Sequence, residues 1–235
     1  RLLCRKYGTN LTYTPMIHAS FYLRKPIYRR RMFSKTPASV VDRPLIVQIA
    51  GRNKTTLLEA ARRIVDEGDG TVDGIDLNLG CPTLTARRGG YGAWLLGSGS
   101  FVVDIVRHLV IHLSPVPVTV KVRLLPGGNL EDSLSLYDRL VDAGIAAMAV
   151  HGRTMFQKGA ETGRADWDAL KVVVGRYSSR IPVLVNGGVG TREDVRDILR
   201  YTGADGVLSA ESILEYPALF SNEVEDEVGG VIGGD

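Results

Sequence analysis

The sequence predicts an α/β protein, and within that class a (β/α)8 TIM barrel that lacks its first strand. Short apolar, β-branched runs alternate along the chain with amphipathic helical patterns. The runs are apolar on both faces, which is typical of parallel strands covered by helices. Polar residues stand at the C-terminal ends of several runs, and in a barrel these ends converge on one mouth.

The first element is a helix end. Residues 1–8 close with Gly8, as helices often do, and a helix before the first visible strand implies an eighth strand upstream. We expect strands at 11–17, 45–50, 74–79, 116–124, 145–151, 181–186 and 206–209. We expect helices at 55–66, 100–113, 130–142, 166–177 and 192–201. Thr191 with Asp194 predicts a capping box on the last of these helices.

The domain organisation follows from composition. Residues 1–220 form one predicted barrel domain, and 221–235 are an acidic, Gly-rich tail that we expect to be disordered. The chain begins with Arg1 and has no visible secretion signal, so we expect a fragment or processed product. Two cysteines among 235 residues exclude a disulfide framework and favour an intracellular protein of the cytoplasm or nucleus. The absence of a run of about 18 apolar residues argues against a membrane span.

Charge is distributed unevenly. Residues 1–41 carry nine Lys or Arg and no Asp or Glu, although the net charge is only +3. Such a block fits a polyanion partner, and a solvated face is the alternative. The four histidines show no ligand spacing with cysteines or carboxylates, so we expect no metal.

Cys81 is the strongest candidate for chemistry. It follows a predicted strand in the sequence Gly80-Cys81-Pro82, on a loop at the face where barrel enzymes place reactive residues. A thiol of ordinary pKa, about 8.5, carries its proton at neutral pH and can act as a general acid. A buried structural cysteine is the alternative.

Lys121 and Arg123 share one face of a predicted strand. Two cations that point into a barrel need an anionic partner. A bound phosphate, a reduced flavin or an internal carboxylate such as Asp76 would supply it.

Two predicted loops suit a phosphate. Asn186-Gly187-Gly188 leads into a helix, and its glycines let backbone N–H groups approach an anion. The following loop, 208–212, occupies the other common phosphate position of this fold. His151 and Arg153 close another strand, where they can contact an anion or a cofactor ring, or be structural.

Together these motifs resemble the tRNA-dihydrouridine synthases, flavin-dependent enzymes that reduce uridines in tRNA. The resemblance spans roughly residues 1–220 and is closest to the eukaryotic type that acts on the D-loop near positions 16 and 17. Its motifs are Tyr13-Thr-Pro-Met-Ile-His18, Pro44-Leu-Ile-Val-Gln-Ile49, Asp76-Leu-Asn-Leu-Gly-Cys-Pro82, Arg88-Gly-Gly-Tyr-Gly-Ala93, Val120-Lys-Val-Arg123, Val150-His-Gly-Arg-Thr154, Lys158-Gly159 with Ala165-Asp-Trp167, and Asn186-Gly187.

The resemblance implies roles for these residues. Cys81 would protonate the 5-carbon of uracil, FMN would be the flavin, and NADPH would reduce it. The implied cofactor ligands are Gln48, Lys121 and His151 at the ring, and Asn186, Gly187, Gly188, Ala210 and Glu211 at the phosphate. The implied substrate ligands are Asn78, Arg123, Arg153 and Tyr91. The implied partner is the tRNA D-loop, bound by a monomer.

The sequence also departs from the family pattern. The opening strand and the helical C-terminal domain of the family are absent, and Ala210-Glu211 replaces the usual Gly-Arg. Two alternatives therefore stay open. One is a related flavin barrel that acts on free pyrimidines, and the other is an inactive truncated barrel with residual RNA binding.

Overall fold

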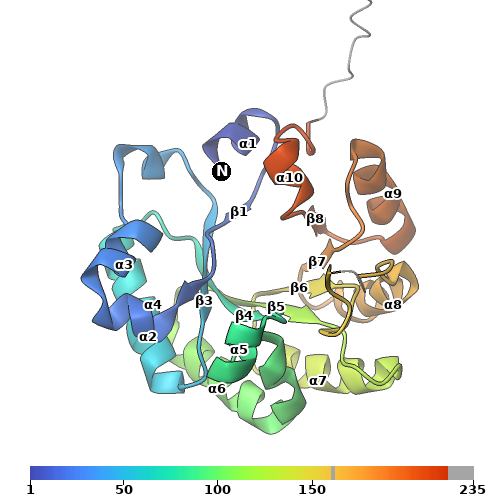
Figure 1. Ribbon diagram of the computed structural model, residues 1–235, viewed down its shortest axis with the longest axis horizontal. Helices are drawn as coiled ribbons and strands as arrows, with labels where there is room; N and C mark the ends of the chain where they lie inside the picture. The colour runs from blue at the N-terminus through green and yellow to red at the C-terminus, as the bar shows by residue number, and fades with distance from the viewer. Residues whose placement is uncertain (160–161, 222–235) are drawn as a thin grey trace, which may run out of the picture.

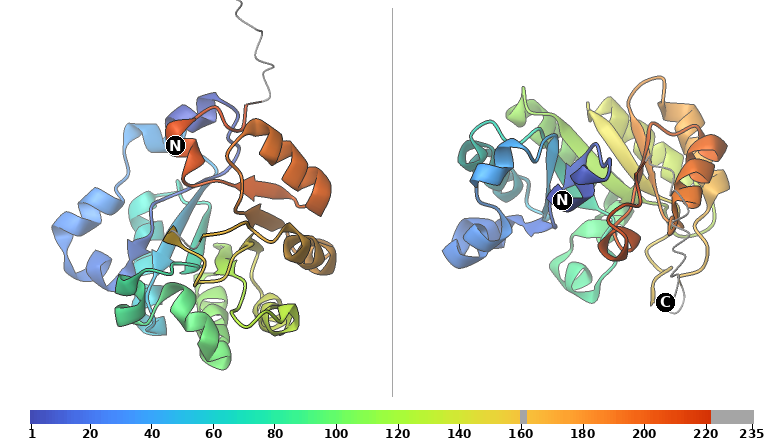
Figure 2. Two further views of the ribbon diagram at one scale, coloured as in Figure 1. Left: turned by 45° about the vertical axis from the view of Figure 1, so that its right-hand side comes forward. Right: turned by 90° about the horizontal axis from the view of Figure 1, so that it is seen from above.

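The computed structural model describes residues 1–159 and 162–221 (Figure 1). Of the tail predicted at 221–235, all but Ser221 lies outside these residues. The described chain forms one curled parallel sheet with helices around its outer side, as the two further views also show (Figure 2).

The sheet follows the order of the chain, β1-β3-β4-β5-β6-β7-β8, with β2 also paired to β3. Every pairing is parallel. The strands are β1 (Thr12–Tyr13), β2 (Ile17–His18), β3 (Leu45–Ala50), β4 (Gly74–Leu79), β5 (Val118–Arg123), β6 (Ala147–His151), β7 (Val183–Asn186) and β8 (Gly206–Leu208).

The strand predicted at 11–17 is wrong as a single element. It is divided into β1 and β2, which pair with the two ends of β3. Pro15 lies between them and has no N–H to donate to a ladder. The side chain of Thr14 replaces part of that ladder, because its hydroxyl accepts a hydrogen bond from the Gln48 backbone N–H at 3.1 Å.

The longer helices follow the strands and pack against the outer side of the sheet (Figure 2). Asn53, Asn129, Asp166 and Thr191 each cap the helix that they precede, and the predicted Thr191–Asp194 capping box is confirmed. The helices are α1 (Leu2–Lys6), α2 (Ala19–Arg24), α3 (Pro26–Met32), α4 (Lys54–Gly68), α5 (Leu84–Gly89), α6 (Gly99–Leu113), α7 (Leu130–Asp142), α8 (Trp167–Tyr177), α9 (Arg192–Thr202) and α10 (Ser212–Glu215), with 3-10 turns η1 (Pro37–Val40) and η2 (Gly92–Ser98).

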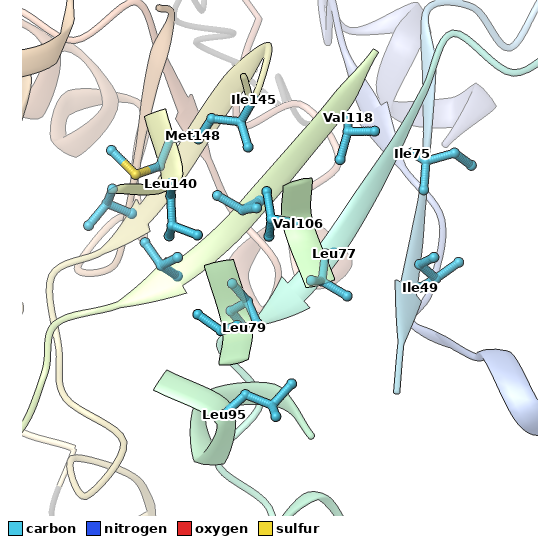
Figure 3. Close-up of a cluster of buried hydrophobic side chains, with 14 of the residues drawn as sticks. Ile49, Ile75, Leu77, Leu79, Leu95, Val106, Val118, Leu140, Ile145 and Met148 are labelled. Carbon is cyan, nitrogen blue, oxygen red and sulfur yellow. The ribbon is translucent and has the colours of Figure 1, made fainter. Parts of the chain in front are cut away.

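The hydrophobic core lies between the sheet and these helices. Ile75, Leu77 and Leu79 of β4 point outward and pack with Val106 of α6 and other apolar side chains (Figure 3). Side chains alternate along a strand, so Asp76 and Asn78 point to the inner side. The outer side of β4 therefore stabilises the fold, and its inner side carries polar groups.

The sheet does not close within the described residues. β1 and β8 form its two edges and do not pair with each other. A cavity of about 540 Å³ lies between them, lined by residues 11–16 on one edge and 207–210 on the other. This arrangement fits the predicted barrel without its first strand.

One segment, Gly92–Leu113, is long and apolar enough to cross a membrane by length and composition. The sequence prediction missed it because Asp104 and Arg107 interrupt the apolar run. Val102, Ile105, Val106 and Leu109 in this segment are fully buried against the rest of the protein. Core helices of soluble proteins pass the same test, so the segment is weak evidence for a span.

Candidate active site

The structure brings the predicted polar strand ends together at the carboxyl edge of the sheet, which we call the mouth. Gln48 lies opposite Asp76, and Asn78 lies opposite Lys121. His151 lies between its register partners Arg123 and Asn186. Five neighbouring strands therefore supply one polar inner surface.

A chain of hydrogen bonds crosses three of these strands. The Thr119 hydroxyl donates to Asp76 Oδ1 at 2.7 Å, and Gln48 Nε2 donates to Asp76 Oδ2 at 2.8 Å. Asn78 Nδ2 donates to Gln48 Oε1 at 2.7 Å, and Asn78 Oδ1 accepts from the Cys81 backbone N–H at 2.9 Å. The chain fixes the Gln48 amide and connects it to the cysteine loop.

Asp76 is fully buried at the centre of this chain. Burial raises the pKa of its carboxyl group to about 6, against the opposing effect of its hydrogen bonds and of the Lys121 charge. The alternative that Asp76 pairs with Arg123 is wrong, because Arg123 donates to the carbonyl oxygens of Gly80 at 2.8 Å and Thr154 at 3.0 Å. Arg123 thus holds the cysteine loop and the loop after β6.

Lys121 has a neutral partner. Its Nζ donates to Asn186 Oδ1 at 2.8 Å, and Asn186 Nδ2 donates to the Leu208 carbonyl at 2.8 Å. Burial, and then repulsion by Arg123, lowers the pKa of Lys121 to about 8, and Asp76 opposes the shift. An anion bound beside Lys121 would stabilise its charge.

His151 presents an unsatisfied atom. Its Nδ1 is buried without a hydrogen-bond partner among the described residues. Burial, followed by the charges of Arg123, Lys121 and Arg153, lowers the pKa of His151 to about 2, so the imidazole is neutral. Gly187 has φ 107°, and a Cβ there would lie 2.9 Å from His151 Cε1. Glycine therefore lets the loop after β7 approach the ring.

The Cys81 loop is held on both sides. The Cys81 carbonyl accepts from the Ala93 N–H at 3.1 Å, and Lys158 Nζ donates to the Pro82 carbonyl at 3.0 Å. The thiol is partly buried, with Sγ 3.3 Å from the Thr83 hydroxyl. Two cavities open at the mouth, one of about 380 Å³ and the other of about 540 Å³. Pro82 lines the smaller one, and Cys81 lines neither.

A cavity of about 380 Å³ is strongly cationic. It is lined by Lys121, Arg123, His151, Arg153 and Lys158, and by residues 186–189 and 208–212, whose one acidic side chain is that of Glu211. It shares Lys121, Asn186 and Ala210 with the 540 Å³ cavity, which Gln48 also lines. The donor set, the orphaned His151 nitrogen and the glycine loop fit an elongated ligand with an anionic end, as FMN is.

The other predicted site residues have structural partners here. Arg153 donates to the Gly163 carbonyl at 2.9 Å, and Asn78 uses both ends of its amide within the chain described above. Tyr91 is buried, and its ring lies edge-on to His18, with centroids 5.1 Å apart. Among the described residues, no group of three or more His, Cys, Asp or Glu can hold a metal.

Sequence reasoning gave no positioning role to Asp76 or Thr119. The same-face spacing of Asp76 and Asn78 was visible in the sequence. Their partners on β3 and β5 depend on strand register, which only the structure supplies.

Solved structures with different ligands share this fold. Mandelate oxidase with benzoyl-formic acid aligns with a TM-score of 0.54 at 20% identity, covering 88% of this chain and 58% of its own. A DHODH from Eimeria tenella in complex with ferulenol aligns with a TM-score of 0.54 at 16% identity, covering 77% of this chain and 56% of its own. At these identities the likeness shows the fold alone, and it confirms the TIM-barrel prediction.

Relatives found by sequence show the family of the chain, where the solved structures show only its fold. The tRNA-dihydrouridine(16/17) synthase [NAD(P)(+)] of Saccharomyces cerevisiae is 37% identical over 94% of this chain, and the corresponding "-like" protein of Rattus norvegicus is 39% identical over 94%. The chain spans about half of their lengths, 51% and 48%. A human tRNA-dihydrouridine(20a/20b) synthase-like protein is 31% identical over 96% of this chain and 67% of its own length. A family model described as dihydrouridine synthase (Dus) matches residues 1–229, and the chain therefore belongs to the dihydrouridine synthase family.

Proposed function

We propose that the protein reduces uridine to 5,6-dihydrouridine in tRNA, with FMN as cofactor and NADPH as its reductant. The observation that carries the proposal is the cationic cavity around Lys121, beside a fixed Cys81 loop, in a chain of this family. The names of the relatives support NAD(P) as the coenzyme class and tRNA as the substrate class.

Each part of the cofactor has candidate ligands. Gln48, Lys121 and His151 would hold the ring, and Asn186, Gly187, Gly188, Ala210 and Glu211 would surround the phosphate. The hydrogen-bond partner of the Lys121 ammonium among the described residues is a neutral amide, so Lys121 is placed to balance a negative charge on the ring. Reduced flavin, when bound, supplies a hydride to the 6-carbon of uracil.

Cys81 would supply the proton that completes the reduction. Its S–H bond breaks as a C–H bond forms at the 5-carbon, which leaves a thiolate on Cys81. The positive charge of Arg123 interacts with Cys81 and would stabilise that thiolate. Solvent then returns the proton, and uridine has gained one hydride and one proton overall.

Two predicted substrate ligands would act mainly by positioning. Asn78 holds the Cys81 backbone, and Arg123 holds the adjoining Gly80 carbonyl. Tyr91 and Arg153 lie on the loops that flank the cysteine, where the target base and its neighbours would enter. A uridine must leave its stack to reach such a site.

The proposal includes the D-loop near positions 16 and 17 as the target, a monomeric protein and an intracellular location. The relatives named for positions 16 and 17 are 36–39% identical to this chain, and those named for 20a/20b are 31% identical. Family membership does not favour the alternative of a free-pyrimidine reductase.

Cys81→Ala tests the acid role. We expect the variant to keep its flavin absorbance and to lose uridine reduction on unmodified tRNA by at least about 100-fold, because a general acid contributes that much. Cys4→Ala controls for the loss of a free thiol; since Cys4 lies on α1 and lines the 540 Å³ cavity, flavin absorbance is compared for both variants before their activity. Dihydrouridine formation at the normal rate in Cys81→Ala would overturn the role.

A further inference from the structure

The basic N-terminal region separates into paired and unpaired cations. Residues 1–41 hold nine Lys or Arg and no acid, so any carboxylate partner comes from elsewhere in the chain. The ion pairs are Arg1 and Arg5 with Asp42, Arg29 with Glu67, and Lys35 with Asp69. Within the part of the chain that the structure describes, the other five pair with no carboxylate: Lys6 on α1, Arg24 on α2, Lys25 between α2 and α3, and Arg30 and Arg31 on α3.

One of these cations, Lys25, lies over an exposed aromatic ring. Phe21 is 39% exposed, and Lys25 Nζ lies 4.5 Å from the centre of its ring. Arg30 and Arg31 are exposed and follow Ile27, which is 75% exposed, by three and four residues, so the three share the outer face of α3. We call Phe21, Lys25, Arg30 and Arg31 the α2–α3 patch.

The patch is connected to the mouth by aromatic contacts. His18 ends β2; its ring stacks on Phe21 with centroids 4.4 Å apart and lies edge-on to Tyr91 with centroids 5.1 Å apart. Tyr28 of α3 accepts a hydrogen bond from the His18 backbone N–H at 3.0 Å. Tyr91 precedes Gly92, where a Cβ would lie 2.9 Å from Cys81 Cβ. The path from patch to thiol is therefore continuous.

An exposed ring beside unpaired cations is the combination that binds single-stranded nucleic acid. Bases stack on the ring, and the cations contact phosphates. We propose that the α2–α3 patch binds RNA nucleotides that flank the target uridine. His18 stacks on one face of Phe21, so the base takes the face that Lys25 covers, and the Lys25 ammonium moves from the ring to a phosphate, with further phosphates at Arg30 and Arg31. This inference rests on the proposed function for the identity of the RNA.

The first test is the affinity of the full chain for an unmodified tRNA transcript, measured by fluorescence anisotropy across a salt series. Arg30→Glu combined with Arg31→Glu should raise the dissociation constant at least 10-fold. It should also reduce the slope of log K against log salt by about 2, roughly one for each lost phosphate contact. Phe21→Ala should weaken binding about 10-fold, and Phe21→Trp should restore it, because a larger ring still stacks.

Lys171→Glu is the matched control. Lys171 also lies over an exposed aromatic ring, 4.8 Å from the centre of Tyr201, but on α8 (Figure 1). Figure 1 shows α8 across the sheet from α2 and α3. We expect this variant to bind tRNA with at most a twofold change. Equal weakening by Lys171→Glu, or unchanged binding by the patch variants, would overturn the proposal.

Uridine reduction measured on the same preparations separates the two proposals. If the unsubstituted protein does not reduce uridine, the proposed function is contradicted, and the tRNA affinities of the variants still test the patch. If the unsubstituted protein reduces uridine but the patch variants bind tRNA as tightly as it does, the patch proposal alone is contradicted. If both hold, the patch variants should raise KM for tRNA more than they lower kcat.

Discussion

Asp76 shows how one buried residue can organise a site. Its two carboxylate oxygens accept from Thr119 and Gln48, and the Gln48 amide then has one orientation, because its oxygen must accept from Asn78. Buried polar groups of this kind are costly when unsatisfied and specific when fully paired. Asp76 is therefore a positioning residue for both Gln48 and the Cys81 loop.

Asp76→Asn tests the state of this carboxyl group. Its pKa is about 6 in the folded protein and near 3.9 when unfolded, so the folded state binds more protons between about pH 4 and 6. The stabilising contribution of the carboxyl group is thus present below pH 4 and is lost as the pH rises through 6. Its full size is on the order of 3 kcal/mol.

Urea unfolding of both proteins at several pH values measures the effect. The difference in unfolding free energy, unsubstituted minus Asp76→Asn, should fall as the pH rises from 4 to 6 and then level off. Taking the difference removes the opposite slope of ion-paired carboxylates such as Asp42. A difference that does not vary with pH would show that the pKa of Asp76 is the same in the folded and unfolded protein, and would contradict the prediction.

At the scale of elements, the strands from 45 onward were predictable, including the short β7 and β8, and the short elements near the N-terminus were not. The strands predicted at 45–50 and 74–79 match β3 and β4, because both are buried at every position and read as apolar runs. Helices α2 and α3 were missed, since each is at most seven residues long and Pro26 separates their patterns. The division of 11–17 at Pro15 was missed as well.

In the candidate site, the positions of the residues were predictable and their side-chain contacts were not. The sequence placed Gln48, Asn78, Lys121, His151 and Asn186 at strand ends, and parallel strands bring such ends together. It could not show that Lys121 binds Asn186, 65 residues away, or that Arg123 avoids Asp76. Such contacts depend on register and rotamer, which spacing along the chain does not determine.

The loop after β7 approaches His151 closely at Gly187. Gly187→Ala adds a Cβ 2.9 Å from His151 Cε1 at a backbone φ of 107°, which L side chains rarely adopt. We expect a loss of about 1–3 kcal/mol of stability and of most flavin affinity. Gly175→Ala, in the exposed interior of α8 with open space around it, should be neutral or stabilise by up to about 1 kcal/mol. Thermal unfolding and flavin titration of both variants would check this, and equal flavin affinity would contradict it.

At the scale of the whole molecule, the two cavities at the mouth draw their walls from elements far apart in the chain. The larger one lies between the sheet edges at β1 and β8, and the cationic one adds the ends of β5, β6 and β7. A ligand across both would connect elements that have no hydrogen-bonded pairing between them in the described residues. Cofactor binding should therefore stabilise the fold as a whole.

FMN titration followed by thermal unfolding tests this coupling. A ligand that binds only the folded state adds about 2.7 kcal/mol at 100 times its dissociation constant, which for a protein of this size raises Tm by about 5–10 °C. Riboflavin has the same ring without the phosphate, so it should bind more weakly and give a smaller shift at equal concentration. Equal shifts from both ligands would place the binding energy in the ring site, and no shift from FMN would contradict the assignment of these cavities to the cofactor. The expected order, FMN above riboflavin, follows from the loops at 186–188 and 210–211, which would hold the phosphate, because both loops line the cationic cavity.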